Sequence, residues 1–218
     1  MKRLLDGVRR YQRRIRARYS RRFASLAERQ APLALFVTCA DSRVVPNLIA
    51  SADPGELFVV RNIANLVPPC ETATDASVPA AIAYAVEVLE VADVVVCGHS
   101  SCGGMKALLG PPPADPHLAR WLDHARPALE VLRTRGPLDP SRPVHDQLSQ
   151  TSALRQLGHL ATYPCVRERL DRGTIRLHAW WFDIASGTAL AYSPTAGRYV
   201  PAVEELARLE SVQPRDVA

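Results

Sequence analysis

Two residues that can bind a metal ion lie three positions apart in the stretch Asp93-Val-Val-Val-Cys-Gly-His-Ser-Ser-Cys-Gly-Gly104. The β-branched run after Asp93 predicts a buried strand, and the glycines at its end predict the start of a helix. His99 and Cys102 should therefore lie at the carboxyl end of a strand, the edge at which α/β sheets bind ligands. An imidazole and a thiolate there could share one metal ion. The alternative is an ordinary strand-to-helix turn with a buried cysteine and a hydrogen-bonded histidine.

A second group of reactive residues follows another predicted buried strand, Leu33 to Thr38. Cys39, Asp41 and Arg43 come directly after it. Alternate side chains of an extended chain point to the same side, so these three should share one side if the extended conformation continues. The structural alternative for Asp41 and Arg43 is an ordinary surface ion pair.

Cys39, His99 and Cys102 together offer two thiolates and one imidazole. This is a three-ligand set typical of a catalytic zinc site that keeps its fourth position open. Cys70 and Cys97 are spare, since Cys97 is expected inside the strand and Cys70 follows a Pro-Pro turn. A redox function is disfavoured because Cys97 and Cys102 lack the C-x-x-C spacing.

The elements that would position these residues alternate between strand and helix. A third strand is predicted at 56–62 and a helix at 77–89, with further helices at about 117–134 and 144–170, the last interrupted at Pro164. Residues 174–183 and 188–192 predict a hairpin around Ser186-Gly187 that adds an antiparallel edge. The pattern predicts an α/β fold with a mostly parallel sheet in a single domain.

Composition favours a single globular core. The chain has 218 residues, of which 47% are hydrophobic, enough to form a core without disulfides or structural metals. Its five cysteines are odd in number, and neither a secretory signal nor an apolar run of membrane-spanning length is present. We therefore expect a cytoplasmic protein with free thiols and no membrane partner.

The positive charge is concentrated at the amino terminus. Residues 1–30 contain Lys2 and ten arginines against Asp6 and Glu28, a net charge of +9, so the other 188 residues carry about −4 of the overall +5. Apolar residues recur there at helical spacing: Leu4, Val8, Tyr11, Ile15, Tyr19, Phe23 and Leu26. This pattern predicts a helix that packs on a partner surface. Binding to nucleic acid or an anionic membrane is disfavoured, as is a cleaved organelle presequence.

Three sequence blocks resemble the signature motifs of the β-class carbonic anhydrases, in the same order. They are Cys39-Ala-Asp-Ser-Arg43, Glu56-Leu-Phe-Val-Val-Arg-Asn-Ile-Ala-Asn65 and Cys97-Gly-His-Ser-Ser-Cys-Gly-Gly104. The resemblance implies a four-stranded parallel core with one antiparallel edge strand and flanking helices. It implies one Zn²⁺ per chain on Cys39, His99 and Cys102, and an arm (residues 1–30) that packs on a second subunit, beside a zinc-binding α/β domain (residues 31–218). A homodimer or higher homo-oligomer follows.

The implied activity is reversible hydration of carbon dioxide to bicarbonate and a proton through a zinc-bound hydroxide. Asp41 and Arg43 would form a dyad beside the metal, Arg43 holding Asp41 off the zinc at neutral pH. The resemblance suggests that four other residues bind substrate, some of them across the dimer interface: Gln30, Phe58, Tyr84 and Gly103. Phe36 stands where the bicarbonate-regulated branch has tryptophan, so we do not expect that regulatory site.

Two other functions remain open from the sequence. A hydrolase of CS2 or COS with the same fold would keep the zinc ligands and differ in access to the pocket. A non-catalytic zinc-binding or nucleic-acid-binding protein would use the arginine-rich arm instead.

Overall fold

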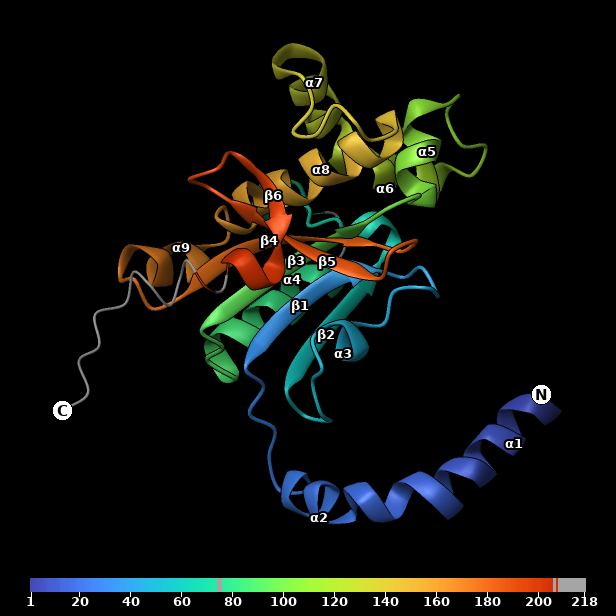
Figure 1. The fold of residues 1–218 in the computed structure, drawn as a ribbon. Coiled ribbons are helices and arrows are strands. Elements are labelled where there is room, and N and C mark those ends of the chain that lie inside the picture. Colours follow the sequence, from blue (N-terminus) through green and yellow to red (C-terminus); the bar gives the residue numbers. More distant parts are fainter. Residues whose placement is uncertain (74–75, 206, 208–218) are drawn as a thin grey trace.

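Six strands form one sheet in the order β2-β1-β3-β4-β5-β6 in the computed structural model, which describes residues 1–73, 76–205 and 207 (Figure 1). The strands are β1 (Ala34–Cys39), β2 (Leu57–Asn62), β3 (Asp93–His99), β4 (Arg176–Asp183), β5 (Thr188–Ser193) and β6 (Arg198–Pro201). The first four pair in parallel, and β5 and β6 are antiparallel. The predicted four-stranded parallel core is therefore confirmed.

The antiparallel edge of the sheet has two strands, β5 and β6, whereas the family resemblance implied one. The additional strand, β6, has only 4 residues and ends at a proline, so it carries little alternation by which to recognise it. Tertiary packing holds it in place, because buried Tyr199 joins a core cluster with Trp181 and Ala179 of β4.

The two faces of the sheet are covered unequally. Leu35 and Val94 belong to a large core cluster on one face, packed under α4, α8 and α9. Phe36 and Val95 point to the other face and belong to a smaller cluster. A groove of about 480 Å³ lies over that second face and is lined mainly by apolar side chains. Within the described residues, this face therefore keeps an uncovered apolar surface.

The helices confirm most of the predicted spans and show where they break. The helices of the body are α3 (Pro46–Ile49), α4 (Ser77–Ala83) with a π-helical turn (Tyr84–Val88), α5 (Gly103–Leu109), α6 (Pro116–Leu122), α7 (Arg126–Arg135), α8 (Val144–Leu160) and α9 (Pro164–Asp171), and short 3₁₀ turns lie at Ile63–Asn65, Cys70–Thr72 and Asp123–Ala125. The expected interruption at Pro164 separates α8 from α9, because proline is tolerated in the first turn of a new helix. Residues 117–134 divide into α6 and α7 around a 3₁₀ turn.

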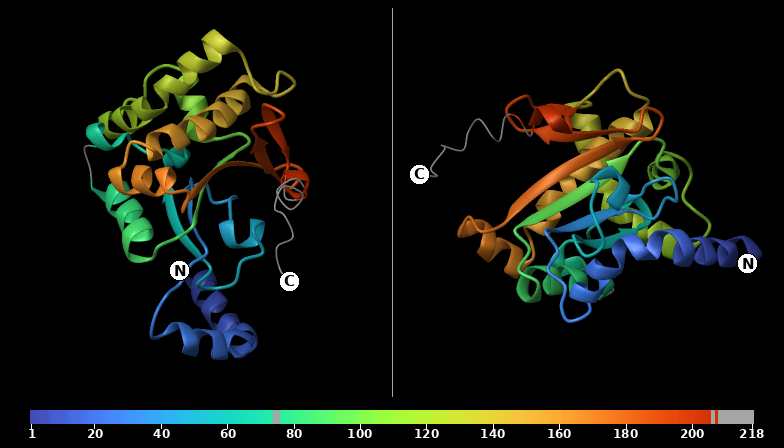
Figure 2. Two further views of the ribbon diagram at one scale, coloured as in Figure 1. Left: turned by 90° about the vertical axis from the view of Figure 1, so that its left-hand side faces the viewer. Right: turned by 60° about the horizontal axis from the view of Figure 1, so that its bottom comes forward.

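The amino-terminal residues form a long helical arm that projects from the body (Figures 1 and 2). It consists of α1 (Lys2–Arg10), a π-helical turn (Tyr11–Ile15) and α2 (Arg16–Leu26). Arg22 ties α2 to the turn before β2, with Nε 2.7 Å from the Pro54 carbonyl oxygen and Nη2 2.9 Å from Glu56 Oε1. Most of the apolar stripe is exposed, with Leu4 at 70% and Val8 at 52%, whereas Leu26 at its end is half-buried against Gly55.

No helix in the described part of the chain is both long enough and apolar enough to cross a membrane. The last helix of the arm ends at Leu26 and β1 begins at Ala34, and the division of the chain at residue 30 stays a prediction. Residues 74–75, 206 and 208–218 lie outside the described residues.

Candidate metal centre

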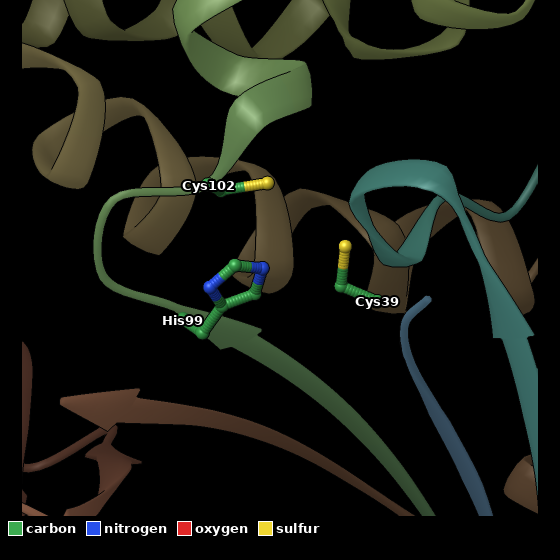
Figure 3. Close-up of side chains that lie close together, drawn as sticks. All are labelled: Cys39, His99 and Cys102. Atoms are coloured by element: carbon green, nitrogen blue, oxygen red, sulfur yellow. The ribbon is translucent and has the colours of Figure 1, made fainter. Parts of the chain in front are cut away.

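Cys39, His99 and Cys102 meet at the carboxyl end of the parallel sheet (Figure 3). Cys39 is the last residue of β1 and His99 the last of β3, while Cys102 immediately precedes α5. One donor atom from each side chain lies within 4.8 Å of the other two. All three are buried, at 5%, 0% and 1% exposure. The neighbouring positions of β1 and β3 in the sheet bring together residues 60 positions apart in the sequence.

Backbone hydrogen bonds fix the orientation of His99. Its Nδ1 lies 2.9 Å from the carbonyl oxygen of Ser100. A carbonyl can only accept, so Nδ1 carries the proton and Nε2 presents a lone pair. Ser100 is itself held to β4 by its N–H, 3.0 Å from the Phe182 carbonyl oxygen. His99 Nε2 is buried and has no hydrogen-bond partner among the described residues.

The sulfur of Cys39 is oriented by the turn after β2. The N–H of Ala64 lies 3.3 Å from Cys39 Sγ. Ala64 has φ +63°, a left-handed conformation that is uncommon for a residue with a side chain. Asn62 stabilises this turn, because its side chain both accepts from the N–H and donates to the carbonyl of Leu66 at 2.8 Å.

The two cysteines have strongly divergent acidities in the absence of a cation. A hydrogen bond from Cys102 is the main cause that lowers the pKa of Cys39 to about 4, against the opposing effect of burial. The same hydrogen bond, together with burial and the charge on Cys39, raises the pKa of Cys102 well above its ordinary value. Without a metal ion, Cys39 is therefore favoured as the thiolate and Cys102 as the thiol. A divalent cation would stabilise both thiolates.

This donor set fits zinc. Two thiolates and one neutral imidazole match the ligand preferences of Zn²⁺ and leave one tetrahedral position for water or substrate. The unpartnered lone pair of His99 Nε2 provides an independent reason for a metal ion here, since a buried acceptor without a partner is costly.

Asp41 and Arg43 form a close pair beside the three donors. Arg43 Nε lies 2.9 Å from Asp41 Oδ1, and Nη2 lies 2.6 Å from Oδ2. Asp41 Oδ2 is 4.0 Å from His99 Nε2. The hydrogen bond from Arg43 holds the pKa of Asp41 well below its usual range. The carboxylate therefore stays ionised and directed at the guanidinium.

The extended conformation expected after Cys39 does not continue to Arg43. We expected Cys39, Asp41 and Arg43 to share a side through continued extended chain, but β1 ends at Cys39 and a turn follows. Arg43 instead turns back, and its own N–H also donates to Asp41 Oδ1 at 3.0 Å. The pair is a local turn motif of the kind that aspartate favours.

Sequence reasoning missed Arg61, which organises the backbone under the site. Its guanidinium donates to the carbonyl oxygens of Cys39 at 3.1 Å and Asp41 at 2.7 Å, and to that of Val44 at 2.9 Å. The available signal was an arginine within the apolar strand Leu57–Asn62. Such a charge requires acceptors nearby.

The residues suggested for substrate binding separate into groups. Gly103 directly follows Cys102 and faces open space. Phe58 and Tyr84 lie together, with ring centroids 5.8 Å apart. Phe58 is aligned with Leu35 near the amino end of the sheet, four residues before the Asn62–Cys39 pair. Gln30 precedes β1 and is exposed. One chain therefore does not bring Gln30, Phe58 and Tyr84 to its own metal centre.

The spare cysteines lie away from the three donors. Cys97 is buried among the residues of the opposite sheet face with Phe36, and burial raises its pKa to about 12. Cys70 is half-buried in the turn Cys70–Thr72. All five cysteines are free thiols.

Comparison with known proteins gives a consistent result. The family model described as carbonic anhydrase matches residues 34–189. A carbonic anhydrase of Pseudomonas aeruginosa is 42% identical over 206 residues, covering 94% of this chain and 93% of the relative. The solved structure of the β-carbonic anhydrase CcaA has a TM-score of 0.85 and 34% identity, covering 92% of this chain and 98% of that chain. A tetrameric β-carbonic anhydrase of Sordaria macrospora has a TM-score of 0.70 and 30% identity, covering 88% and 93%.

Proposed function

We propose that Cys39, His99 and Cys102 bind the catalytic zinc of this chain, which belongs to the β-class carbonic anhydrase family. The enzyme catalyses the reversible hydration of CO2 with zinc as its cofactor. The observation that carries the proposal is the convergence of three buried donors within 4.8 Å at the carboxyl edge of the sheet. Bound zinc supplies an electrophilic centre that acidifies water to a pKa near neutrality. The reaction consumes one CO2 and one water and yields bicarbonate and one proton.

Asp41 orients the reacting water in this proposal. Its Oδ2 lies 4.0 Å from His99 Nε2, so an acceptor whose pKa Arg43 lowers would lie beside a metal ion held by the three donors. By accepting a hydrogen bond from the water, Asp41 directs an oxygen lone pair at the carbon of CO2. Arg43 keeps the carboxylate in this position through two charge-assisted hydrogen bonds.

Substrate binding in this proposal needs a second copy of the chain. Gly103 adjoins the metal centre of its own chain, whereas Gln30, Phe58 and Tyr84 lie toward the opposite end of the strands. We propose that residues from this group reach across the interface and form the wall of the CO2 pocket at the metal centre of the partner subunit. The partly exposed ring of Tyr84, at 42% exposure, is available for such a contact.

The homodimer is held in part by the amino-terminal arm. The arm (residues 1–30) exposes the apolar stripe, and the zinc-binding domain (residues 31–218) exposes an apolar groove over Phe36 and Val95. Each copy thus has two apolar surfaces that association would cover. Higher assembly is compatible with this arrangement, since the Sordaria macrospora relative is tetrameric.

We place the enzyme in the cytoplasm, where a reducing environment keeps its five free thiols available. The small-molecule substrate is CO2 or bicarbonate. Nucleic acid is not among the partners in this proposal, because the charge of the arm is accounted for as the solvated side of a docking helix.

Turnover of three substrates by one zinc-loaded sample tests this function. Stopped-flow assays with CO2, COS and CS2 should give hydration of CO2 as the dominant activity. Dominant turnover of COS or CS2 would identify the same-fold hydrolase instead. A CO2 rate equal to that of buffer, with salt-sensitive DNA binding, would identify a non-catalytic protein.

A further inference from the structure

Ser101 is the turning point of the loop that joins two of the proposed ligands, His99 and Cys102. It has φ +54°, in the left-handed region that residues with side chains rarely adopt. The loop is only two residues long, so the conformation of Ser101 sets the direction in which each ligand leaves it. A residue in this conformation persists only where its surroundings hold it.

The carboxylate of Asp146 holds the backbone of Ser101 in place. Asp146 lies in the first turn of α8 and is 5% exposed. Its Oδ1 accepts a hydrogen bond from the Ser101 N–H at 2.6 Å, a short contact of the charge-assisted kind. His145 Nε2 lies 3.5 Å from the same oxygen.

A second residue of α8 holds the preceding part of the loop. Ser149 Oγ donates to the His99 carbonyl oxygen at 2.9 Å, and it accepts from Trp181 Nε1 at 3.1 Å. Asp146 and Ser149 are three positions apart, so they lie on one side of the helix. α8 therefore contacts the loop at two points, one at His99 and one at Ser101.

The carbonyl of Ser101 connects the same loop to the dyad. Arg43 Nη2 lies 3.3 Å from this oxygen while also donating to Asp41 Oδ2. Asp146 thus accepts a hydrogen bond from the N–H of Ser101, and Arg43 donates one to its carbonyl oxygen. Any displacement of Ser101 would move two ligands and the residue that restrains Asp41.

We propose that Asp146 is a positioning residue of the metal centre. By accepting the Ser101 N–H it holds the left-handed turn that directs His99 and Cys102 to one ion and offers the Ser101 carbonyl to Arg43. This inference rests on the proposed zinc site and adds to it a buried residue on α8, 44 positions beyond Cys102 in the sequence.

Zinc affinity of three variants, measured by competition with a chromogenic chelator, tests the proposal. Asp146→Ser has too short a side chain to reach Ser101, whereas Asp146→Asn keeps an acceptor oxygen. Asp115→Ser is the matched control, because Asp115 also accepts a backbone N–H at the start of a helix but lies exposed, away from the loop. We expect Asp146→Ser to bind zinc about 10- to 100-fold more weakly, with Asp146→Asn close to wild type and Asp115→Ser unchanged.

The absorption spectrum of the cobalt-substituted proteins gives a readout that general loss of stability would not change. Asp146→Ser should alter the ligand-field bands and Asp146→Asn should restore them. Wild-type affinity and an unaltered spectrum in Asp146→Ser would overturn the proposal, as would equal losses in the Ser and Asn variants. Absence of zinc binding in the wild-type protein would instead contradict the proposed metal site itself.

A measurement on the unmodified protein covers the case in which Asp146→Ser does not fold. The Ser101 amide proton should exchange slowly with solvent in the zinc-loaded enzyme, despite its place in a loop, because Asp146 holds it. Exchange as fast as that of an exposed loop amide would show that this hydrogen bond does not hold the turn, and would overturn the proposal.

Discussion

Asp41 and Arg43 are joined by two side-chain hydrogen bonds, and this pairing holds the carboxylate beside the three metal donors, with Asp41 Oδ2 4.0 Å from His99 Nε2. Arg43→Ala should free Asp41 to swing onto the open metal position and compete with water. We expect kcat/KM for CO2 hydration to fall about 10- to 100-fold near neutral pH, as is typical when a group that orients a metal site is removed. Stopped-flow assays measure the loss.

The matched control for that variant is Arg126→Ala, which removes an exposed arginine from an ion pair with Asp123 outside the site. It should retain wild-type activity. X-ray absorption should also detect an added carboxylate ligand in Arg43→Ala and none in the wild type. A wild-type enzyme with Asp41 on the zinc near pH 7 would contradict the open arrangement while leaving the three other ligands intact.

The exposed apolar stripe of the arm should contribute to the dimer. Deletion of residues 1–26 should yield monomer or aggregate with reduced activity, because the apolar surface that the arm covers on the partner becomes exposed. A milder test is the double variant Leu4→Ser and Val8→Ser, which changes two residues that are 70% and 52% exposed in the single chain. Light scattering coupled to size-exclusion chromatography should show a shift toward monomer.

Arg3→Ser with Arg9→Ser is the control for the arm, since it removes the same number of large side chains from the basic side. It should remain dimeric. If the double variant Leu4→Ser and Val8→Ser is also a fully active dimer, the stripe packs on its own body and the dimer uses another surface.

Asp93 should make the folding stability depend on pH in the acid range. Burial disfavours its charge, but hydrogen bonds from His178 and Arg176 outweigh burial and hold the pKa of Asp93 below its usual range. A lowered folded-state pKa stabilises the protein above the unfolded pKa of about 4, and that contribution is lost as the pH falls toward the folded-state value. Asp93→Asn should therefore cost about 1–2 kcal/mol of unfolding free energy at pH 7.

Denaturant unfolding at pH 7 and pH 3 measures this difference, which should shrink at the lower pH. Asp171→Asn, at an exposed site at the end of α9, should change stability little at either pH. A deficit in Asp93→Asn that stays constant between pH 7 and pH 3 would mean that the charge of Asp93 does not contribute.

The placement of the metal donors at the ends of two strands was predictable from the sequence, because local patterns identify those strands. The β-branched run before Cys97 and the apolar run before Cys39 identify β3 and β1, and parallel neighbours end at one edge. The meeting of Cys39, His99 and Cys102 follows from that topology. The resemblance to a known family added the order and roles of the motifs.

Other parts of the site depend on tertiary contacts that no local pattern reveals. Arg61 and Asp146 support the site from a strand and a helix that lie far from it in the sequence. Both bind backbone N–H or carbonyl groups, and the identity of a side chain does not reveal such contacts. The Asp41–Arg43 pair was expected from extended chain, but a turn produces it. β6 was missed because its contacts with β5 and Trp181, rather than its own pattern, stabilise it.

Zinc content and CO2 hydration, determined on the same samples of wild type, Cys102→Ala and Cys70→Ser, test the metal centre most directly. Cys102 is one of the three convergent donors, and Cys70 is a half-buried free thiol outside that cluster. We predict one zinc per chain with rapid hydration in the wild type and in Cys70→Ser, and loss of both in Cys102→Ala. Full zinc retention and activity in Cys102→Ala would contradict the account.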